Sequence, residues 1–276
     1  MNFVAAALKR VDLRPEVDPL TGTVRHDGRA WGFSLADAAA LEWALRLGEA
    51  WQLPVAAITA GPAEARGVLR DAAAFGAERL VHAPAREGAP SEAIARALAP
   101  ALGGAVVVCC GDYSADRGSG SVPAFLAHRL DAAQALGLTG LSPGERGVLA
   151  AQRRLDGGRR ERLRVVAPVV ISVEPDAARL RRAPLSGLVA ARRAAIETAP
   201  AVEAAEHRSR VHVLRTTPYR PRPKTLPPPS DRAPGGRLLA LTGSLSERTP
   251  PRVVKAAADQ AADELIGYLK DQGYLT

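Results

Sequence analysis

Aromatic residues are scarce in this sequence: they make up 4% of its 276 residues, and only four of its 37 basic residues are lysine. The net charge of +8 makes nucleic acid a candidate partner. However, the aromatic residues do not interleave with the arginines, as a base-stacking surface requires. We therefore expect no nucleic-acid partner, and an acidic protein partner accounts for the charge equally well.

Cysteine is also scarce: Cys109 and Cys110 stand side by side in the apolar run "AVVVCC". Two cysteines provide neither a disulfide framework nor a four-ligand zinc site. Neighbouring strand residues point to opposite faces, so we expect two separate core side chains. The five histidines lack metal-ligand spacing, and there is no obvious carboxylate pair. We expect no metal and no catalytic residue.

Long apolar runs are missing as well, because charge or proline interrupts every window of 18 apolar residues. The opening "MNFVAAALKR" has a short apolar part, and its positive charges follow that part. This pattern favours a first strand over a signal peptide. We expect a cytoplasmic protein without membrane insertion.

Strand and helix signals alternate through the first 130 residues. The predicted strands are Phe3–Leu8, Pro54–Gly61, Arg79–Ala83 and Ala105–Cys110. The predicted helices are Ser34–Ala50, Ala63–Gly76, Ser91–Leu102 and one that starts at Val122. Ser34 and Asp37 have the spacing of a capping box. Strands that are apolar throughout predict a parallel sheet covered on both faces, so the expected fold is an open, mostly parallel Rossmann-like α/β sheet.

The pattern changes after residue 146. The stretches "GVLAAQRRL", "RRERLRVVA" and "PVVISV" read as strands, and Asp156-Gly157-Gly158 predicts a hairpin between the first two. We expect this piece to form an antiparallel extension at the edge of the sheet.

The core signal fades near Pro200, so we expect a nucleotide-binding α/β domain over residues 1–200 and an arm over 201–276. The stretch Thr216–Gly236 is basic and rich in proline, which predicts an extended linker. An amphipathic helix is predicted near Pro251–Gln272. We expect this arm to pack on another chain.

The run "GDYSADRGSGS", residues 111–121, directly follows the apolar strand. Its glycines allow tight turns, its serines add hydroxyl groups, and the next helix offers its N-terminus, which together suit a phosphate group. A simple turn is the alternative reading. There is no GK[ST] motif, which argues against triphosphate hydrolysis. Asp116 has two readings, a ribose ligand or a cap for the loop.

A specific resemblance rests on "AQRRLDGGRRERLRVVAPVVIS", residues 151–172. This stretch resembles the signature of the electron transfer flavoprotein beta subunit family. The segments "ALKRV", "SLADAAALEWALRL", "ITAGP" and "EPDAARLRRAPLSGLVAARRAAIE" resemble further family segments in the same order. The resemblance covers about residues 1–200, and the C-terminal arm fits more loosely.

The resemblance implies an electron carrier subunit that is not itself an enzyme. It implies a heterodimer with an alpha subunit, a structural AMP on this chain, and FAD held mainly by the alpha subunit. Electrons would arrive from a flavin-dependent dehydrogenase and leave toward a quinone reductase. The implied AMP contacts are Ala7, Ser34, Leu35, Ala36, Asp37, Ala60, Gly111, Asp112, Tyr113, Ser114, Ala115, Asp116, Arg117, Gly118 and Ser119. Ala7 and Ala60 would act through backbone groups beside the adenine.

The sequence departs from the family at several positions. Ser34 replaces an asparagine, Leu13 replaces a tyrosine near the flavin, and the loop over residues 111–121 is shorter than in the mitochondrial type. The short loop leaves a bifurcating-type subunit open, with FAD in place of AMP. A stand-alone nucleotide-binding α/β domain is a further alternative. Leu185 matches a family leucine that inserts into a dehydrogenase partner, although an ordinary turn or core leucine is the other reading.

Overall fold

The computed structural model describes residues 2–201, 214–215, 217–218, 233–242 and 253–271. The chain divides into two units, Met1–Tyr219 and Arg220–Thr276.

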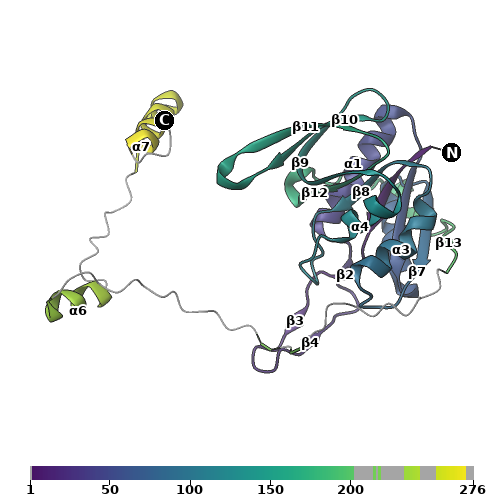
Figure 1. The fold of residues 1–276 in the computed structure, drawn as a ribbon, viewed down its shortest axis with the longest axis horizontal. Helices are drawn as coiled ribbons and strands as arrows, with labels where there is room; N and C mark the ends of the chain where they lie inside the picture. Colours follow the sequence, from purple (N-terminus) through teal and green to yellow (C-terminus); the bar gives the residue numbers. More distant parts are fainter. Residues whose placement is uncertain (1, 202–213, 216, 219–232, 243–252, 272–276) are drawn as a thin grey trace. The chain divides into compact units, whose positions relative to one another are not determined.

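The first unit is built on a nine-stranded sheet with the order β11-β10-β9-β12-β8-β1-β6-β7-β13 (Figure 1). Its strands are β1 (Phe3–Leu8), β6 (Val55–Gly61), β7 (Arg79–Pro84), β8 (Ala105–Gly111), β9 (Ala133–Pro143), β10 (Val148–Arg154), β11 (Arg160–Val166), β12 (Val169–Val173) and β13 (Glu197–Thr198). Along the sheet order, every neighbouring pair from β9–β12 to β7–β13 is parallel. The β9–β10 and β10–β11 pairs are antiparallel. The predicted open sheet with its antiparallel extension is confirmed.

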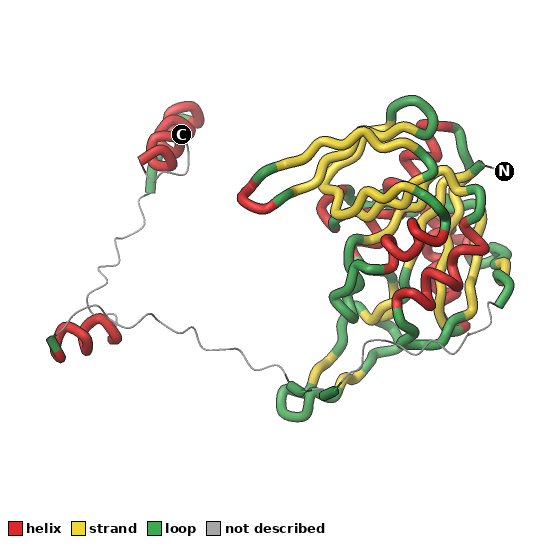
Figure 2. The backbone as a smooth tube through the Cα atoms, in the orientation of Figure 1, coloured by secondary structure: helices red, strands yellow, loops and turns green. Residues whose placement is uncertain are grey.

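Helices cover both faces of the parallel part, as its uniformly apolar strands predict (Figure 2). They are α1 (Leu35–Trp51), α2 (Arg66–Phe75), α3 (Ser91–Leu102), α4 (Val122–Arg129) and α5 (Leu185–Ala191), with short 3-10 turns η1 (Ala63–Ala65), η2 (Asp156–Gly158) and η3 (Pro175–Ala177). Side chains of α1 and α2 share one core with the sheet, and side chains of α3 and α4 share the other. Cys109 belongs to the first core and Cys110 to the second, so the expected opposite orientation is confirmed.

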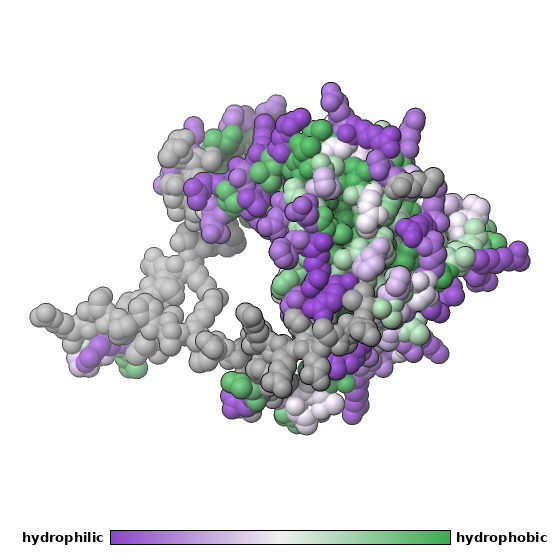
Figure 3. Space-filling view, turned by 45° about the vertical axis from the view of Figure 1, so that its right-hand side comes forward, coloured by the Kyte–Doolittle hydropathy of each residue, from purple (hydrophilic) through white to green (hydrophobic). Residues whose placement is uncertain are grey.

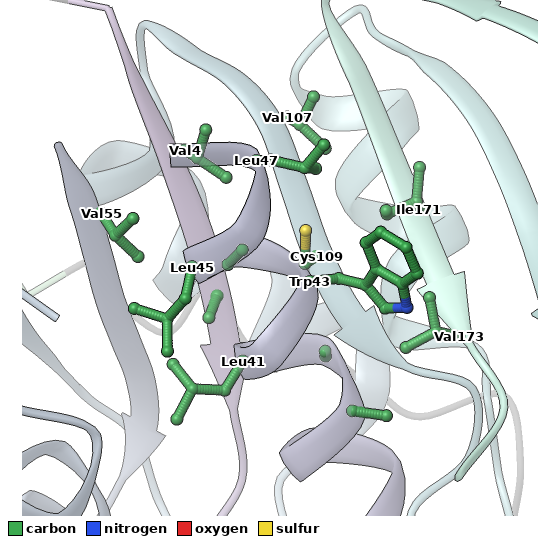
Figure 4. Close-up of a cluster of buried hydrophobic side chains, with 14 of the residues drawn as sticks. Val4, Leu41, Trp43, Leu45, Leu47, Val55, Val107, Cys109, Ile171 and Val173 are labelled. Atoms are coloured by element: carbon green, nitrogen blue, oxygen red, sulfur yellow. The ribbon is translucent and has the colours of Figure 1, made fainter. Parts of the chain in front are cut away.

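Helix α1 is the central element of the first core (Figure 4). It is buried around most of its circumference, and Leu41 and Leu47 are fully inaccessible to solvent. The Trp43 ring packs near β12, and its Nε1–H donates to the Ala177 carbonyl oxygen at 3.2 Å. Because α1 is held this firmly, its N-terminus has a fixed position beside the sheet.

Two parts of the first unit were not predicted. Strand β9 (Ala133–Pro143) contains Gly137, at φ +68°, and Gly140, and such glycines weaken a strand signal. The second part is the pair of small antiparallel ladders β2 (Val11–Asp12) with β5 (Trp31–Gly32) and β3 (Glu16–Val17) with β4 (Val24–Arg25). These ladders form a hairpin that extends from the sheet (Figures 1 and 2). Two-residue strands are too short to show a period of two, so no sequence pattern predicts them.

In the second unit the described residues form α6 (Pro234–Thr242) and α7 (Ala258–Asp271). The predicted linker to Gly236 is therefore too long by three residues, because α6 starts at Pro234. Proline suits a first helical turn, where its missing N–H is not needed. Residues 219–232 of the predicted linker lie outside the described residues. Helix α7 confirms the predicted amphipathic helix with closer bounds. Among the described residues, no helix is both long and apolar enough to cross a membrane.

Candidate nucleotide site

The candidate site lies at the carboxyl edge of the sheet, where β1, β6 and β8 end side by side. Ligands of open α/β sheets bind at this edge. The structure places Ala7 near the end of β1, Ala60 near the end of β6, and residues 111–119 at and after the end of β8. Ser34 to Asp37 form the start of α1, which contacts the ends of β1 and β8. The residues predicted from separate parts of the sequence are therefore brought together.

The start of α1 is tied to the strand ends through Asp37. Ser34 is the N-cap, and its Oγ accepts from the Asp37 N–H at 3.1 Å, as the predicted cap requires. The Asp37 carboxylate accepts from the backbone N–H of Lys9 at 3.1 Å and from that of Gly111. Burial raises the pKa of Asp37 to about 7, although these hydrogen bonds act in the opposite direction. One buried carboxyl thus joins the helix to β1 and β8.

Glycine is required at two positions of this junction. A Cβ at residue 111 would lie 2.6 Å from Asp37 Oδ1 and 3.0 Å from the Ala36 carbonyl carbon. A Cβ at residue 120 would overlap the Asp112 carbonyl oxygen. The closeness of the backbones, and not a turn alone, accounts for these two glycines.

The 111–121 loop folds back on itself. The Ser114 N–H donates to the Ser119 carbonyl oxygen at 3.0 Å, and the Gly118 N–H donates to the Ser114 carbonyl oxygen at 2.7 Å. Gly118 has φ +62°, which favours glycine. The Arg117 guanidinium donates to the Ala89 carbonyl oxygen at 2.9 Å, ahead of α3. These bonds give the loop a defined shape.

Asp112 points toward the sheet. Its Oδ1 accepts from the Ser172 hydroxyl at 2.8 Å, and the Ser172 Oγ accepts from the Gly137 N–H at 2.9 Å. Ser172 is buried in β12, so these two hydrogen bonds join the end of β8 to β12 and β9. Asp112 therefore fastens the start of the loop to the sheet. The contribution of Ser172 to this contact was not predicted from the sequence.

Lys9 was not among the predicted contacts, yet it has the most direct polar contacts with the loop. Its Nζ donates to Ser114 Oγ at 2.8 Å and to the two Asp116 carboxylate oxygens at 2.6 and 2.7 Å. Burial tends to raise the pKa of Asp116, but the hydrogen bonds from Lys9 and Ser114 outweigh it and hold that pKa below its ordinary value. The available signal was the position of Lys9 directly after the first strand.

A family model of the electron transfer flavoprotein domain matches residues 21–204. The chain belongs to the electron transfer flavoprotein family. Protein FixA of Rhizobium meliloti (strain 1021) is 31% identical over 189 residues, which are 64% of this chain and 64% of FixA. The chain thus spans about 64% of the length of this curated relative. Membership in this family associates the chain with electron transfer by flavoproteins.

Within this electron transfer flavoprotein chain, the carboxyl edge carries a set of donors that suits a phosphate group. Lys9 supplies an ammonium group, and Ser114, Ser119 and Ser121 supply hydroxyls next to the start of α4. Ala7 and Ala60 are partly exposed and carry only methyl groups at this edge. Among the described residues there is no group of three or more His, Cys, Asp or Glu side chains that could hold a metal. This arrangement of donors can bind an anion.

Leu185 lies away from this edge. It begins α5, which packs against α2, and a Cβ at Gly187 would overlap the Ala74 carbonyl oxygen in the last turn of α2. Helix α2 runs back from the carboxyl end of β6, so its last turn lies at the amino edge of the sheet. Leu185 is 77% exposed, which excludes the alternative that it is a core leucine.

Proposed function

We propose that the chain is the beta-type subunit of a heterodimeric electron transfer flavoprotein. It binds AMP as a structural ligand and helps to hold the FAD of an alpha-type subunit. The flavin receives electrons from a flavin-dependent dehydrogenase and passes them toward a quinone reductase. The cofactor supplies the redox chemistry, and this chain positions it. The observation that carries the proposal is the convergence of Lys9, the start of α1 and the 111–121 loop at one edge of the sheet.

The geometry of this edge supports a nucleotide with one phosphate. An anion there would meet the Lys9 ammonium, the serine hydroxyls and the N-terminus of α4. The 111–121 loop lacks the lysine of a P-loop, and its cation is Lys9, the residue directly after β1. The buried Asp37 holds the start of α1 against the ends of β1 and β8. A ligand bound there would therefore contact backbone with a fixed position. This arrangement suits a bound structural ligand that does not turn over.

The surface of α5 supports a docking role. Leu185, Leu188 and Val189 are 77%, 49% and 57% exposed, and Arg192 and Arg193 follow them. Exposed apolar side chains also gather in a band on the face of the first unit drawn in Figure 3, where hydrophilic residues border them. A small apolar anchor beside positive charge suits transient contact with an acidic dehydrogenase.

The segment before α5 is held by a buried acid. Glu42 of α1 accepts from Arg46 Nε at 2.8 Å, from the Arg181 backbone N–H at 3.1 Å and from Arg181 Nε at 3.0 Å. Arg181 also pairs with Glu49. Burial tends to raise the pKa of Glu42, but the arginine hydrogen bonds lower it further than burial raises it. This cluster fixes the chain that leads to Leu185.

Helix α7 supports a partner for the C-terminal arm. None of its described residues is buried, and Leu265, Ile266 and Tyr268 are 58%, 44% and 50% exposed. An amphipathic helix of this length gains its stability from packing its apolar face. We propose that the arm, residues 201–276, packs on the alpha-type subunit.

The experiment is to co-express the full chain with an electron transfer flavoprotein alpha-type subunit, purify the pair and count its nucleotides. The proposal expects one FAD and one AMP per heterodimer. Two FAD and no AMP would favour the bifurcating-type reading. A chain that stays monomeric and retains neither AMP nor flavin beside the alpha-type subunit would contradict the proposal.

A further inference from the structure

At the carboxyl edge, the Lys9 ammonium contacts side chains of the 111–121 loop. No other lysine precedes residue 224. Its backbone N–H is bound to the buried Asp37 carboxyl at 3.1 Å, which fixes the point from which its side chain starts. The Lys9 ammonium therefore reaches the loop from a rigid base.

Three arginines near this edge, Arg10, Arg66 and Arg117, have protein partners of their own. The Arg10 guanidinium lies 3.7 Å from the centre of the Trp31 ring. Arg66 Nη2 donates to Thr198 Oγ1 at 3.1 Å, and Arg117 Nη1 donates to the Ala89 carbonyl oxygen at 2.9 Å. Compared with these three described arginines, Lys9 directs its charge at Ser114 and Asp116 of the loop.

Three groups meet at that point: the Lys9 ammonium, the Ser114 hydroxyl and the Asp116 carboxylate. Lys9 Nζ lies 2.6 Å from Asp116 Oδ1 and 2.8 Å from Ser114 Oγ, and the Ser114 hydroxyl also donates to Asp116. Carboxylate and phosphate oxygens accept from the same donors. The Asp116 carboxylate thus takes the hydrogen bonds that a phosphate would take.

We propose that Lys9 is the group that recognises the phosphate of the bound nucleotide. In the absence of nucleotide the Asp116 carboxylate forms an ion pair with the Lys9 ammonium, and the phosphate displaces this carboxylate when it binds. The inference rests on the proposed function, because it concerns the same nucleotide site. It assigns Lys9 as a binding residue and Asp116 as an internal competitor. The site then prefers a nucleotide with a phosphate to the uncharged nucleoside.

Displacement of Asp116 is feasible because the ion pair is partly in solvent. The side chains of Lys9 and Asp116 are 41% and 43% exposed, and such pairs are weak. The phosphate of AMP carries close to two negative charges at neutral pH, whereas the carboxylate carries one. Once displaced, Asp116 stays close to the phosphate and repels it. Removing the negative charge of Asp116 should therefore tighten AMP binding.

Calorimetric titration of the full chain with AMP and with adenosine tests this inference. Asp116→Asn should bind AMP about two- to fivefold more tightly, because the competing ion pair is gone. Lys9→Met should bind AMP roughly 10- to 100-fold more weakly, as expected for loss of hydrogen bonds to a charged group. Adenosine affinity should stay within about twofold in both variants, because adenosine has no phosphate.

The control for net charge is Asp156→Asn, which removes an exposed carboxylate in the distant β10–β11 turn. It should leave AMP affinity unchanged. In a Lys9→Met background there is no Lys9–Asp116 ion pair for Asp116→Asn to remove. The effects of the two substitutions on AMP affinity should therefore not be additive. Thermal unfolding of each variant should stay near that of the wild type, because the pair is exposed.

Equal or weaker AMP binding by Asp116→Asn would overturn the inference, and so would an equal change for adenosine. In those cases AMP still binds to the wild type, and the proposed nucleotide site stands. If neither the wild type nor Asp116→Asn binds AMP, both the inference and the proposed AMP site are wrong.

Discussion

The buried Asp37 carboxyl should make the stability of this protein depend on pH in an unusual direction. Burial raises its pKa from 3.8 to about 7. Between these values the folded protein keeps a proton that the unfolded chain releases, so the free energy of unfolding falls as the pH rises. Each pKa unit corresponds to about 1.36 kcal/mol, so Asp37 should lower the free energy of unfolding by about 4 kcal/mol between pH 4 and pH 8.

Comparison with Asp37→Asn isolates this effect, because asparagine does not titrate. The amide has one acceptor oxygen where the carboxylate has two, so an N–H of Lys9 or Gly111 loses its acceptor. That loss changes the free energy of unfolding by the same amount at every pH, whereas the contribution from the titration of Asp37 varies with pH. Denaturant unfolding of both proteins at several pH values should show the wild type losing about 4 kcal/mol relative to Asp37→Asn from pH 4 to pH 8. A difference that stays constant with pH would refute the reasoning, and Asp156→Asn is the matched control.

The remaining predictions concern the loop, the docking surface and the arm. Gly120→Ala should abolish AMP binding measured by calorimetry while the sheet still folds, because a Cβ overlaps the Asp112 carbonyl oxygen; Gly67→Ala, which meets no atom within 4 Å, is the control. Leu185→Ala should weaken dehydrogenase binding by about 1–3 kcal/mol and leave the heterodimer intact; unchanged electron-transfer kinetics would contradict its role. Glu42→Gln should lower the free energy of unfolding by about 1–3 kcal/mol, because Arg46 and Arg181 lose a charged acceptor; unaltered denaturant unfolding would show that the cluster contributes little. A chain truncated after Pro218 should lose FAD from the purified pair, and full flavin content would disprove a role for the arm.

The parallel sheet could be predicted because its signals are local. The apolar runs of β1, β6 and β8, the Ser34 cap and the Gly76 helix end each depend on a few neighbouring residues. Gly76 ends α2 with φ +119°, which a residue with a Cβ rarely adopts. Strand β9 was missed because its stability comes from pairing with β10 and β12, and its own glycines hide the pattern.

The candidate site could be predicted only in part. The 111–121 loop was found because glycine and serine after an apolar strand are a local signal. The contacts of Lys9 with Ser114 and Asp116 span 105 and 107 residues, and no local pattern reveals such a pair. The role of Ser172 was missed for the same reason, because it supports Asp112 from a strand 60 residues away.

The most direct test of an adenylate site at the carboxyl edge is an AMP titration of the isotopically labelled full chain, followed by the shifts of its backbone amide signals. The proposal predicts that the largest shifts fall on Ala7, Lys9, Ala60 and residues 111–119, with little change in α5. Shifts centred elsewhere, or no shifts at AMP concentrations that saturate the calorimetric signal, would contradict it.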